Sequence, residues 1–214
     1  PDLCADAFAA IPWVRGIERV VLSSVVPEKN AVLSDIFGDR LLVVSHELEL
    51  GVAIDYPEPQ TIGADRLANA AAVASLQGAP AVVVDFGTAV TFDIISRAGA
   101  YVGGVIAPGL EVMTDYMFQR TALLPKIDLL EPTEIIGKST RSAMLAGAVH
   151  GYRGMIKEIL NEIYGEFSVS GGQHPTTIAT GGYAELISEK VDQIDAVDPE
   201  FTLQGLRIIS SLNR

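Results

Sequence analysis

Two short apolar runs separated by one helical segment constrain the fold of this chain more than any other feature. The run at 19–26 (RVVLSSVV) stops at Pro27 and predicts a buried strand, and Leu41–Ser45 predicts another. Between them, the spacing of apolar residues over Glu28–Phe37 predicts a helix that ends at Gly38. A strand, a helix and a strand in so short a span form a parallel crossover unit, so we expect an α/β protein.

A second block of strands follows a long alanine-rich helix, which begins after Asp65 and ends at Gly78 and Pro80. Beyond it the pattern predicts strands at 81–84, 89–95, 101–107 and 176–180. It also predicts several helices within 110–164, with breaks at Pro125 and Pro132, and helices at 184–189 and 203–212. We therefore expect two domains, residues 1–80 and 81–214, with a ligand cleft between them.

The composition excludes several classes of protein. Acidic residues number 27 and basic residues 15, and the resulting net charge of −12 repels nucleic-acid phosphates. The mean hydropathy of +0.32 excludes a disordered chain, yet no run approaches the length of a membrane span and no signal peptide is visible. The single cysteine, Cys4, cannot form an internal disulfide. We expect a cytoplasmic protein that binds neither nucleic acid nor membrane.

The strand at 81–84 runs into Asp85-Phe86-Gly87-Thr88, a candidate phosphate-binding turn. A carboxylate at the end of a buried strand needs a cation or hydrogen-bond donors. Gly87 permits close backbone approach, and the following amides and the Thr88 hydroxyl can face a phosphate. A plain hairpin turn capped by Asp85 is the alternative. The magnesium-binding DFG of protein kinases is excluded, because the other motifs of that fold are missing.

Gly63-Ala64-Asp65-Arg66 opens the alanine-rich helix and has two interpretations. Asp65 could serve only as the N-cap of the helix, with Arg66 in solvent. Alternatively, Asp65 accepts a proton and Arg66 supplies a planar cation for a carboxylate or phosphate. The residues alone leave both open.

Two further glycine-containing motifs are weaker. Gly181-Gly182 separates a strand from a helix, which suits either a tight turn or close approach of a flat or anionic group. Gly137-Lys138-Ser139-Thr140 ends like a phosphate-binding P-loop. That loop requires a glycine where Pro132 stands and a strand before it, so we exclude a P-loop.

From about Arg19 onward, the chain resembles type III pantothenate kinase in its motifs and in their order. The motifs are GADR at 63–66, DFGTAVTFD at 85–93, IGKST at 136–140 and ATGG at 179–182. The resemblance implies two ribonuclease H-like halves of the actin-like ATPase and sugar-kinase superfamily, flanking a nucleotide cleft. It also implies a homodimer that phosphorylates pantothenate in the first step of coenzyme A synthesis. ATP, Mg²⁺ and a monovalent cation (K⁺ or NH₄⁺) would be needed.

The same resemblance implies a role for each matched residue. Asp65 would be the general base toward the pantothenate hydroxyl, and Asp85 would hold the monovalent cation. The pantothenate site would also be lined by Tyr56, Gly63, Ala64, Arg66 and Thr140. The ATP site would comprise Gly87 and Thr88 at the phosphates and Gly181 and Gly182 at the adenosine.

One part of the family pattern has no match. Residues 1–18 lead directly into what corresponds to the family's fourth strand, without the N-terminal DxGNT phosphate loop. We therefore expect a first half that is incomplete at its N-terminus and a chain that is impaired or inactive as it stands. A non-catalytic relative with a binding or regulatory role is the alternative, and a sugar or acetate kinase of the same superfamily is a third hypothesis.

Overall fold

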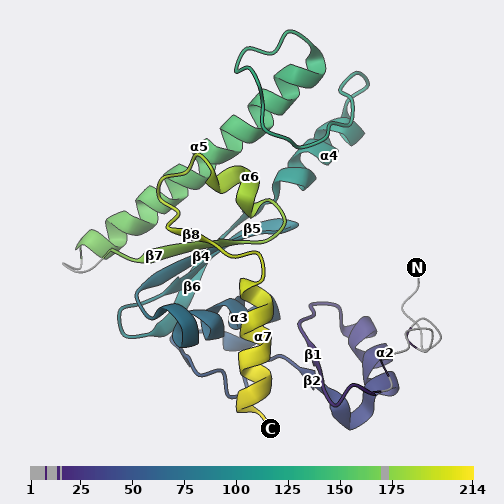
Figure 1. The fold of residues 1–214 in the computed structure, drawn as a ribbon, viewed down its shortest axis with the longest axis vertical. Helices are drawn as coiled ribbons and strands as arrows, with labels where there is room; N and C mark the ends of the chain where they lie inside the picture. Colours follow the sequence, from purple (N-terminus) through teal and green to yellow (C-terminus); the bar gives the residue numbers. More distant parts are fainter. Residues whose placement is uncertain (1–7, 9–13, 15, 170–173) are drawn as a thin grey trace.

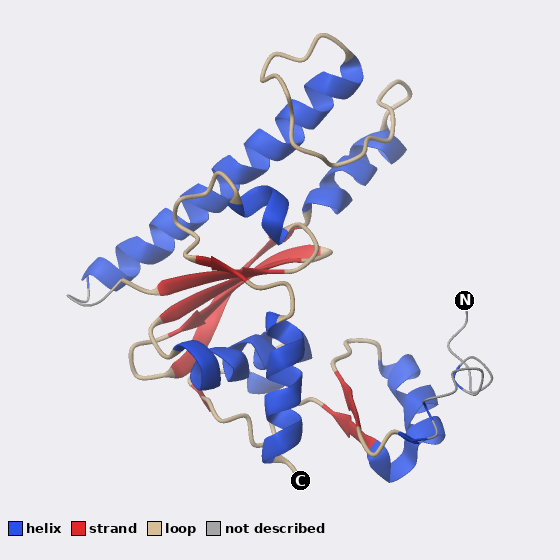
Figure 2. Ribbon diagram, in the orientation of Figure 1, coloured by secondary structure: helices blue, strands red, loops and turns tan. Residues whose placement is uncertain are grey.

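The computed structural model describes residues 8, 14, 16–169 and 174–214, and in this part of the chain the fold is α/β. The described residues form one sheet of two strands and another of six (Figure 1, Figure 2). Cys4 lies outside them, so the inference from that cysteine stays a prediction. No helix in the described ranges is both long and apolar enough to cross a membrane.

The predicted strand–helix–strand unit is confirmed. Parallel strands β1 (Val20–Leu22) and β2 (Leu41–Val43) are connected through helix α2 (Pro27–Phe37) and the short η2 (Gly38–Arg40). The predicted length and burial of the first strand were wrong. β1 is only three residues long and half-buried. The Ser24 hydroxyl accepts a hydrogen bond from the amide of Val26 (3.1 Å), a local turn after the strand.

The larger sheet has the strand order β3-β6-β5-β4-β7-β8 and mixes parallel and antiparallel pairs. β5 runs antiparallel to β4 and β6, whereas the other three pairs are parallel. The strands are β3 (Ala53–Ile54), β4 (Ala81–Phe86), β5 (Ala89–Ile95), β6 (Ala100–Pro108), β7 (Thr176–Thr180) and β8 (Ala196–Val197). The four longest confirm the predictions, and the two-residue edge strands were not predicted.

The large sheet lies between two layers of helices (Figure 2). Val82 and Val84 of β4 pack toward α5 and α6, whereas Ala81 and Val83 pack toward α3 and α7. Burial on both faces explains why β4 is a continuous apolar run. The helices are α3 (Ala64–Ala72), its extension η4 (Val73–Gln77), α4 (Leu110–Arg120), α5 (Thr140–Val169), α6 (Ala184–Ser188) and α7 (Phe201–Leu212), with a short η3 (Pro59–Thr61) before α3.

Helices α3 and α7 cross at very short range. A Cβ atom at Gly205 of α7 would lie 1.9 Å from the carbonyl oxygen of Ala68 on α3, so only glycine fits there. The buried alanines of α3 also have small side chains, which lets the two helices approach closely. The C-terminal helix is therefore tied to the helix that carries Asp65 and Arg66.

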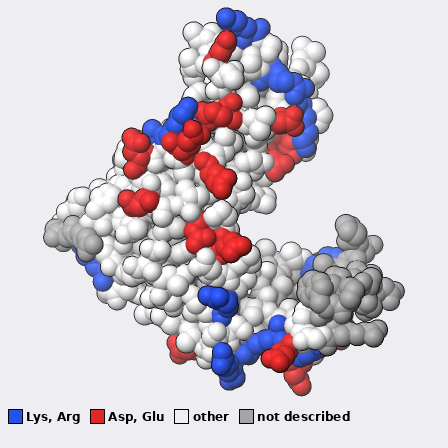
Figure 3. Space-filling model, in the orientation of Figure 1, with Lys and Arg blue, Asp and Glu red and all other residues white. Residues whose placement is uncertain are grey.

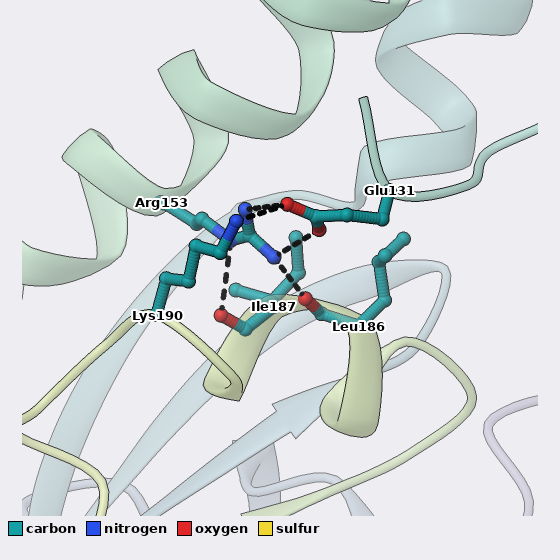
Figure 4. Close-up of polar contacts among 5 residues, drawn as sticks. All are labelled: Glu131, Arg153, Leu186, Ile187 and Lys190. Atoms are coloured by element: carbon teal, nitrogen blue, oxygen red, sulfur yellow. Dashed lines mark hydrogen bonds and ion pairs between the residues drawn. The ribbon is translucent and has the colours of Figure 1, made fainter. Parts of the chain in front are cut away.

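The prediction of helices over 110–164, broken at Pro125 and Pro132, is confirmed, although the interruption is longer than the two prolines alone suggest. Two helices, α4 and α5, are separated by the non-helical segment 121–139, which contains Pro125 and Pro132. Proline lacks the backbone donor and disfavours helical geometry in the residue before it, which accounts for the breaks at these positions. Glu131 fastens the segment to α5 through Arg153, whose guanidinium also contacts two carbonyls of α6 (Figure 4).

The division at residue 80 stays a prediction. Strand β3 and helix α3 precede that residue, yet β3 pairs with β6 and α3 packs on the same face of the large sheet as α7. The segment that leads into the second block therefore already belongs to its layers.

Candidate active site

The end of β4 places the Asp85 carboxylate beneath helix α3. The Asn69 side chain on α3 favours the charged form of Asp85. β4 and β5 form an antiparallel hairpin at this turn, so the hairpin alternative stays open. Burial raises the pKa of Asp85 to about 6, and the carboxylates of Asp65 and Asp93 add to that rise. The site therefore holds three carboxylates close enough to influence one another.

The diglycine after β7 lies against the same carboxylate. Gly181 adopts a φ of +90°, and a Cβ atom there would lie 2.6 Å from Asp85 Oδ1. Both the left-handed backbone and the missing side chain thus require glycine. The structure brings together the two motifs that the sequence marked for nucleotide binding.

Asp65 lies in the first turn of α3, whose N-cap is Gly63, so the N-cap interpretation of Asp65 was wrong. Its Oδ1 accepts a hydrogen bond from the backbone amide of Arg66 (2.9 Å). The side chain is half-buried, and its charge acts on Asp85 across the site. Carboxylates from two blocks of the sequence therefore lie close enough to interact.

Asp93 is the site residue that sequence reasoning missed. Its side chain is fully buried, and its two oxygens accept hydrogen bonds from Arg66 Nε (2.8 Å) and Asn69 Nδ2 (3.1 Å). Burial lowers the pKa of Arg66, but the nearby Asp93 carboxylate raises it by more, so the guanidinium stays charged. The available signal was an aspartate alternating with the apolar residues of β5, at a position that an ordinary core strand fills with an apolar side chain.

The donor set at Asp85 fits a cation that takes oxygen ligands. In the described part of the chain, Asp85 forms no ion pair, whereas Asp93 is paired with Arg66. The same ranges contain no cluster of three or more histidine, cysteine or acidic side chains able to form a metal cage. One carboxylate beside closely approaching backbone suits a weakly hydrated monovalent ion, which proteins hold with backbone carbonyl oxygens.

A cavity of about 510 Å³ lies between the Asp85 turn and helix α4. Gly87, Thr88 and Gly182 line it, and the Tyr183 hydroxyl donates to Glu111 (3.2 Å) across its wall. Other lining residues include Phe86, Val112, Asp115, Tyr116 and Gln119. The molecule is hollowed on one side between α4 and the small sheet, and acidic side chains lie at the inner edge (Figure 3). A polyanion entering here requires a bound cation.

Tyr56 lies on the Arg66 side of the site. Its ring meets that of Tyr101 edge-on, with centroids 6.1 Å apart, and covers Gly103. Arg66 lies over the Tyr101 ring, 5.6 Å from its centroid. Gly63 and Ala64 line a smaller cavity of about 260 Å³ beside the small sheet. Gly63 and Ala64 thus precede Asp65 at the start of α3, and Tyr56 lies close to Arg66.

Thr140 is not brought into this group. It opens α5 and lines a separate hollow of about 870 Å³ with Met113 and Met117 of α4. That end of α5 lies far from α3 (Figure 1). Within one chain, Thr140 therefore does not border the Asp65 site.

Comparison with known proteins places these motifs in a family. The family model for type III pantothenate kinase matches residues 4–162. A type III pantothenate kinase of Akkermansia muciniphila is 53% identical over 92% of this chain and 79% of its own length. The chain belongs to the type III pantothenate kinase family. A relative from Methylacidiphilum infernorum with the same name is 45% identical over 92% of this chain and 72% of its own.

A solved structure shares the fold of this family member at much lower identity. The Campylobacter jejuni protein, named for the Baf family of transcriptional activators, superposes with a TM-score of 0.61 at 20% identity. The match covers 98% of this chain and 88% of that one. At such identity the likeness concerns the fold alone.

Proposed function

We propose that this kinase transfers the γ-phosphoryl group of ATP to the primary hydroxyl of pantothenate, giving 4′-phosphopantothenate in the first step of coenzyme A biosynthesis. Membership of the family supports the reaction. The observation that carries the proposal is the convergence of Asp65 from α3 and Asp85 from β4 beside a nucleotide-sized cavity. Phosphoryl transfer depends mainly on positioning and charge neutralisation, which such a site supplies.

Asp65 acts as the general base. The pantothenate hydroxyl oxygen forms a bond to the γ-phosphorus, the bond from that phosphorus to the β,γ-bridging oxygen breaks, and the hydroxyl proton passes to the Asp65 carboxylate. The hydrogen bond from the Arg66 amide fixes one Asp65 oxygen and leaves the other for the substrate. ADP leaves with the bridging oxygen.

Gly87, Thr88, Gly181 and Gly182 bind ATP, the first pair at the phosphates and the second at the adenosine. Gly87, Thr88 and Gly182 line one cavity, and Gly181 lies against Asp85, which supports a shared nucleotide site. Asp85 would hold a monovalent cation, K⁺ or NH₄⁺, and Mg²⁺ would be bound by the ATP phosphates. These cations, when bound, neutralise phosphate charge beside the acidic wall of the cavity.

Tyr56, Gly63, Ala64 and Arg66 bind pantothenate. The guanidinium of Arg66 is a planar fork suited to a carboxylate, the one charged group of that substrate. Thr140 lies too far from this group in its own chain, so we place it in the site of a second copy within a homodimer. Exposed apolar residues on α4, which include Met113, Tyr116 and Phe118, support a subunit contact beside Thr140.

We further propose that residues 81–214 form one ribonuclease H-like half and that the small sheet belongs to the other, with the nucleotide cleft between them. The strand order β6-β5-β4-β7-β8, in which only β5 is antiparallel, supports the assignment of the C-terminal half. The hollow between α4 and the small sheet supports the position of the cleft (Figure 3).

The experiment measures ADP release by the protein with ATP, Mg²⁺ and K⁺ and a panel of acceptors. We expect measurable turnover with pantothenate, slower than in an unimpaired family member, and none with hexoses, glycerol or acetate. Turnover with a sugar or with acetate in place of pantothenate would refute the substrate assignment. No turnover with any acceptor, together with tight binding of a protein partner, would favour the non-catalytic alternative.

A further inference from the structure

The guanidinium of Arg66 is held at one nitrogen and available at the other two. Its Nε donates to Asp93, and its face rests on the Tyr101 ring. Among the residues that the structure describes, no group accepts a hydrogen bond from Nη1 or Nη2. Gly104 stands opposite Asp93 in the sheet, and a Cβ atom there would lie 2.9 Å from Nη2. Glycine at this position leaves space beside Nη2.

Asp93 itself cannot meet a substrate. Its side chain has no exposed surface, and one oxygen accepts from Arg66 while the other accepts from Asn69. Burying a carboxylate costs several kcal/mol unless a cation and donors compensate it. A plain core position would carry an apolar residue, so this arrangement needs a reason beyond packing.

The orientation of Asp93 is fixed from the C-terminal helix. Thr202 of α7 donates to Asn69 Oδ1 (2.8 Å), which directs the Asn69 amide group toward Asp93. The close crossing of α7 and α3 at Gly205 holds the two helices at that spacing. A continuous chain of hydrogen bonds thus runs from α7 through Asn69 and Asp93 to Arg66.

We propose that Asp93 is a positioning residue for the acceptor substrate: it acts through Arg66, holding the guanidinium with both Nη groups directed to the pantothenate carboxylate. The inference rests on the proposed function, because it takes Arg66 as a pantothenate contact. Loss of Asp93 would free the guanidinium to rotate and remove the charge-assisted bond that holds it.

The test is a double-mutant cycle on kinetics and binding. In Asp93→Asn we expect the KM for pantothenate, and its Kd by titration calorimetry, to rise about 10-fold, while the KM for ATP changes less than about 3-fold. In an Arg66→Met background the same change should have no further effect on pantothenate, because its intermediary is gone. Asp195→Asn is the matched control: Asp195 accepts from the Thr177 amide (2.8 Å) outside this network, and pantothenate KM should not change.

Thr202→Val gives a milder second variant if Asp93→Asn does not fold. It removes one hydrogen bond at the far end of the chain, and we expect a rise in pantothenate KM of about 2- to 5-fold that also disappears with Arg66→Met. An unchanged pantothenate KM, equal losses for ATP and pantothenate, or an effect that persists with Arg66→Met would overturn the inference alone. A wild-type protein that neither binds nor phosphorylates pantothenate would overturn the proposed function, and this inference with it.

Discussion

Replacing Arg153 with methionine will remove an anchor that joins three segments of the chain. The side chain of Arg153 is only 4% exposed. Its Nη1 and Nη2 donate to the two oxygens of Glu131 (3.1 and 2.6 Å), and it also donates to the carbonyls of Leu186 and Ile187 at the end of α6 (Figure 4). Methionine keeps much of the apolar stem but supplies no donor.

The structure sets the size of the loss. Hydrogen bonds to a charged group contribute about 1.5–3 kcal/mol each, and breaking one partner of a buried ion pair costs about 3–5 kcal/mol. Glu131 remains one-third exposed and can be hydrated after the change, which lowers the cost. We expect the free energy of unfolding to fall by about 3 kcal/mol, and the melting temperature by about 6–12 °C for a chain of this size.

Urea unfolding followed by circular dichroism measures the loss, with Lys190→Met as the matched control. Lys190 bonds the same Glu131 (2.7 Å), but its side chain is 54% exposed, so its removal should cost less than about 1 kcal/mol. Equal losses in the two variants, or a loss below about 1 kcal/mol for Arg153→Met, would refute the reasoning.

Acid gives a second readout of the same contact. Hydrogen bonds from Arg153 and then Lys190 lower the pKa of Glu131 from 4.5 to about 2. Because the folded pKa is depressed, the stabilisation is complete above the ordinary pKa and is lost as the pH falls toward 2. Arg153→Met should therefore lose less stability than the wild type over that range.

Two further predictions concern Asp85 and the helix crossing. Because the pKa of Asp85 is raised to about 6, protons compete with the cation, and the affinity for K⁺ should fall as the pH drops through 6. Asp85→Asn should abolish activation by K⁺. A variant that K⁺ still activates would contradict this assignment. Without cation, wild-type stability should decline as the pH rises from 3.8 to about 6, whereas Asp85→Asn should not show this decline. Gly205→Ala should destabilise the fold by about 1–3 kcal/mol in urea titrations, because the added methyl group meets Ala68. Gly151→Ala is the control: it is exposed on α5 with no atom nearby, and it should stabilise the fold by about 0.5–1 kcal/mol. Equal effects of the two substitutions would refute the packing argument.

Most of the large sheet could be predicted from the sequence, because its four longest strands carry uninterrupted or alternating apolar patterns. The two-residue strands β3 and β8 could not, since two residues show no periodicity. They exist because neighbouring strands offer free backbone groups at the sheet edges. In 121–139 the prolines mark the break between helices, whereas the contact of Glu131 with Arg153 that holds the segment depends on the fold and could not be predicted.

The candidate site was predictable where glycine or a buried charge marks a position. Asp65, Asp85 and Gly181 carry such marks, and the structure places them together. The role of Asp93 was not predictable, because it depends on which residue faces it from another helix, and sequence spacing does not show that Arg66 reaches it. Thr140 shows the opposite case, since its motif matches the family while its position in one chain lies apart from the other residues.

The most direct test follows the chemical step in a single turnover. With enzyme in excess and [γ-³²P]ATP, rapid quenching measures transfer of label to pantothenate in the wild type and in Asp65→Asn. Loss of a general base should slow this transfer by about 10²–10⁴-fold while leaving the Kd of pantothenate nearly unchanged. Equal rates of label transfer in the two proteins would show that the proton leaves by another route and that the carboxylates of α3 and β4 do not form the reacting centre.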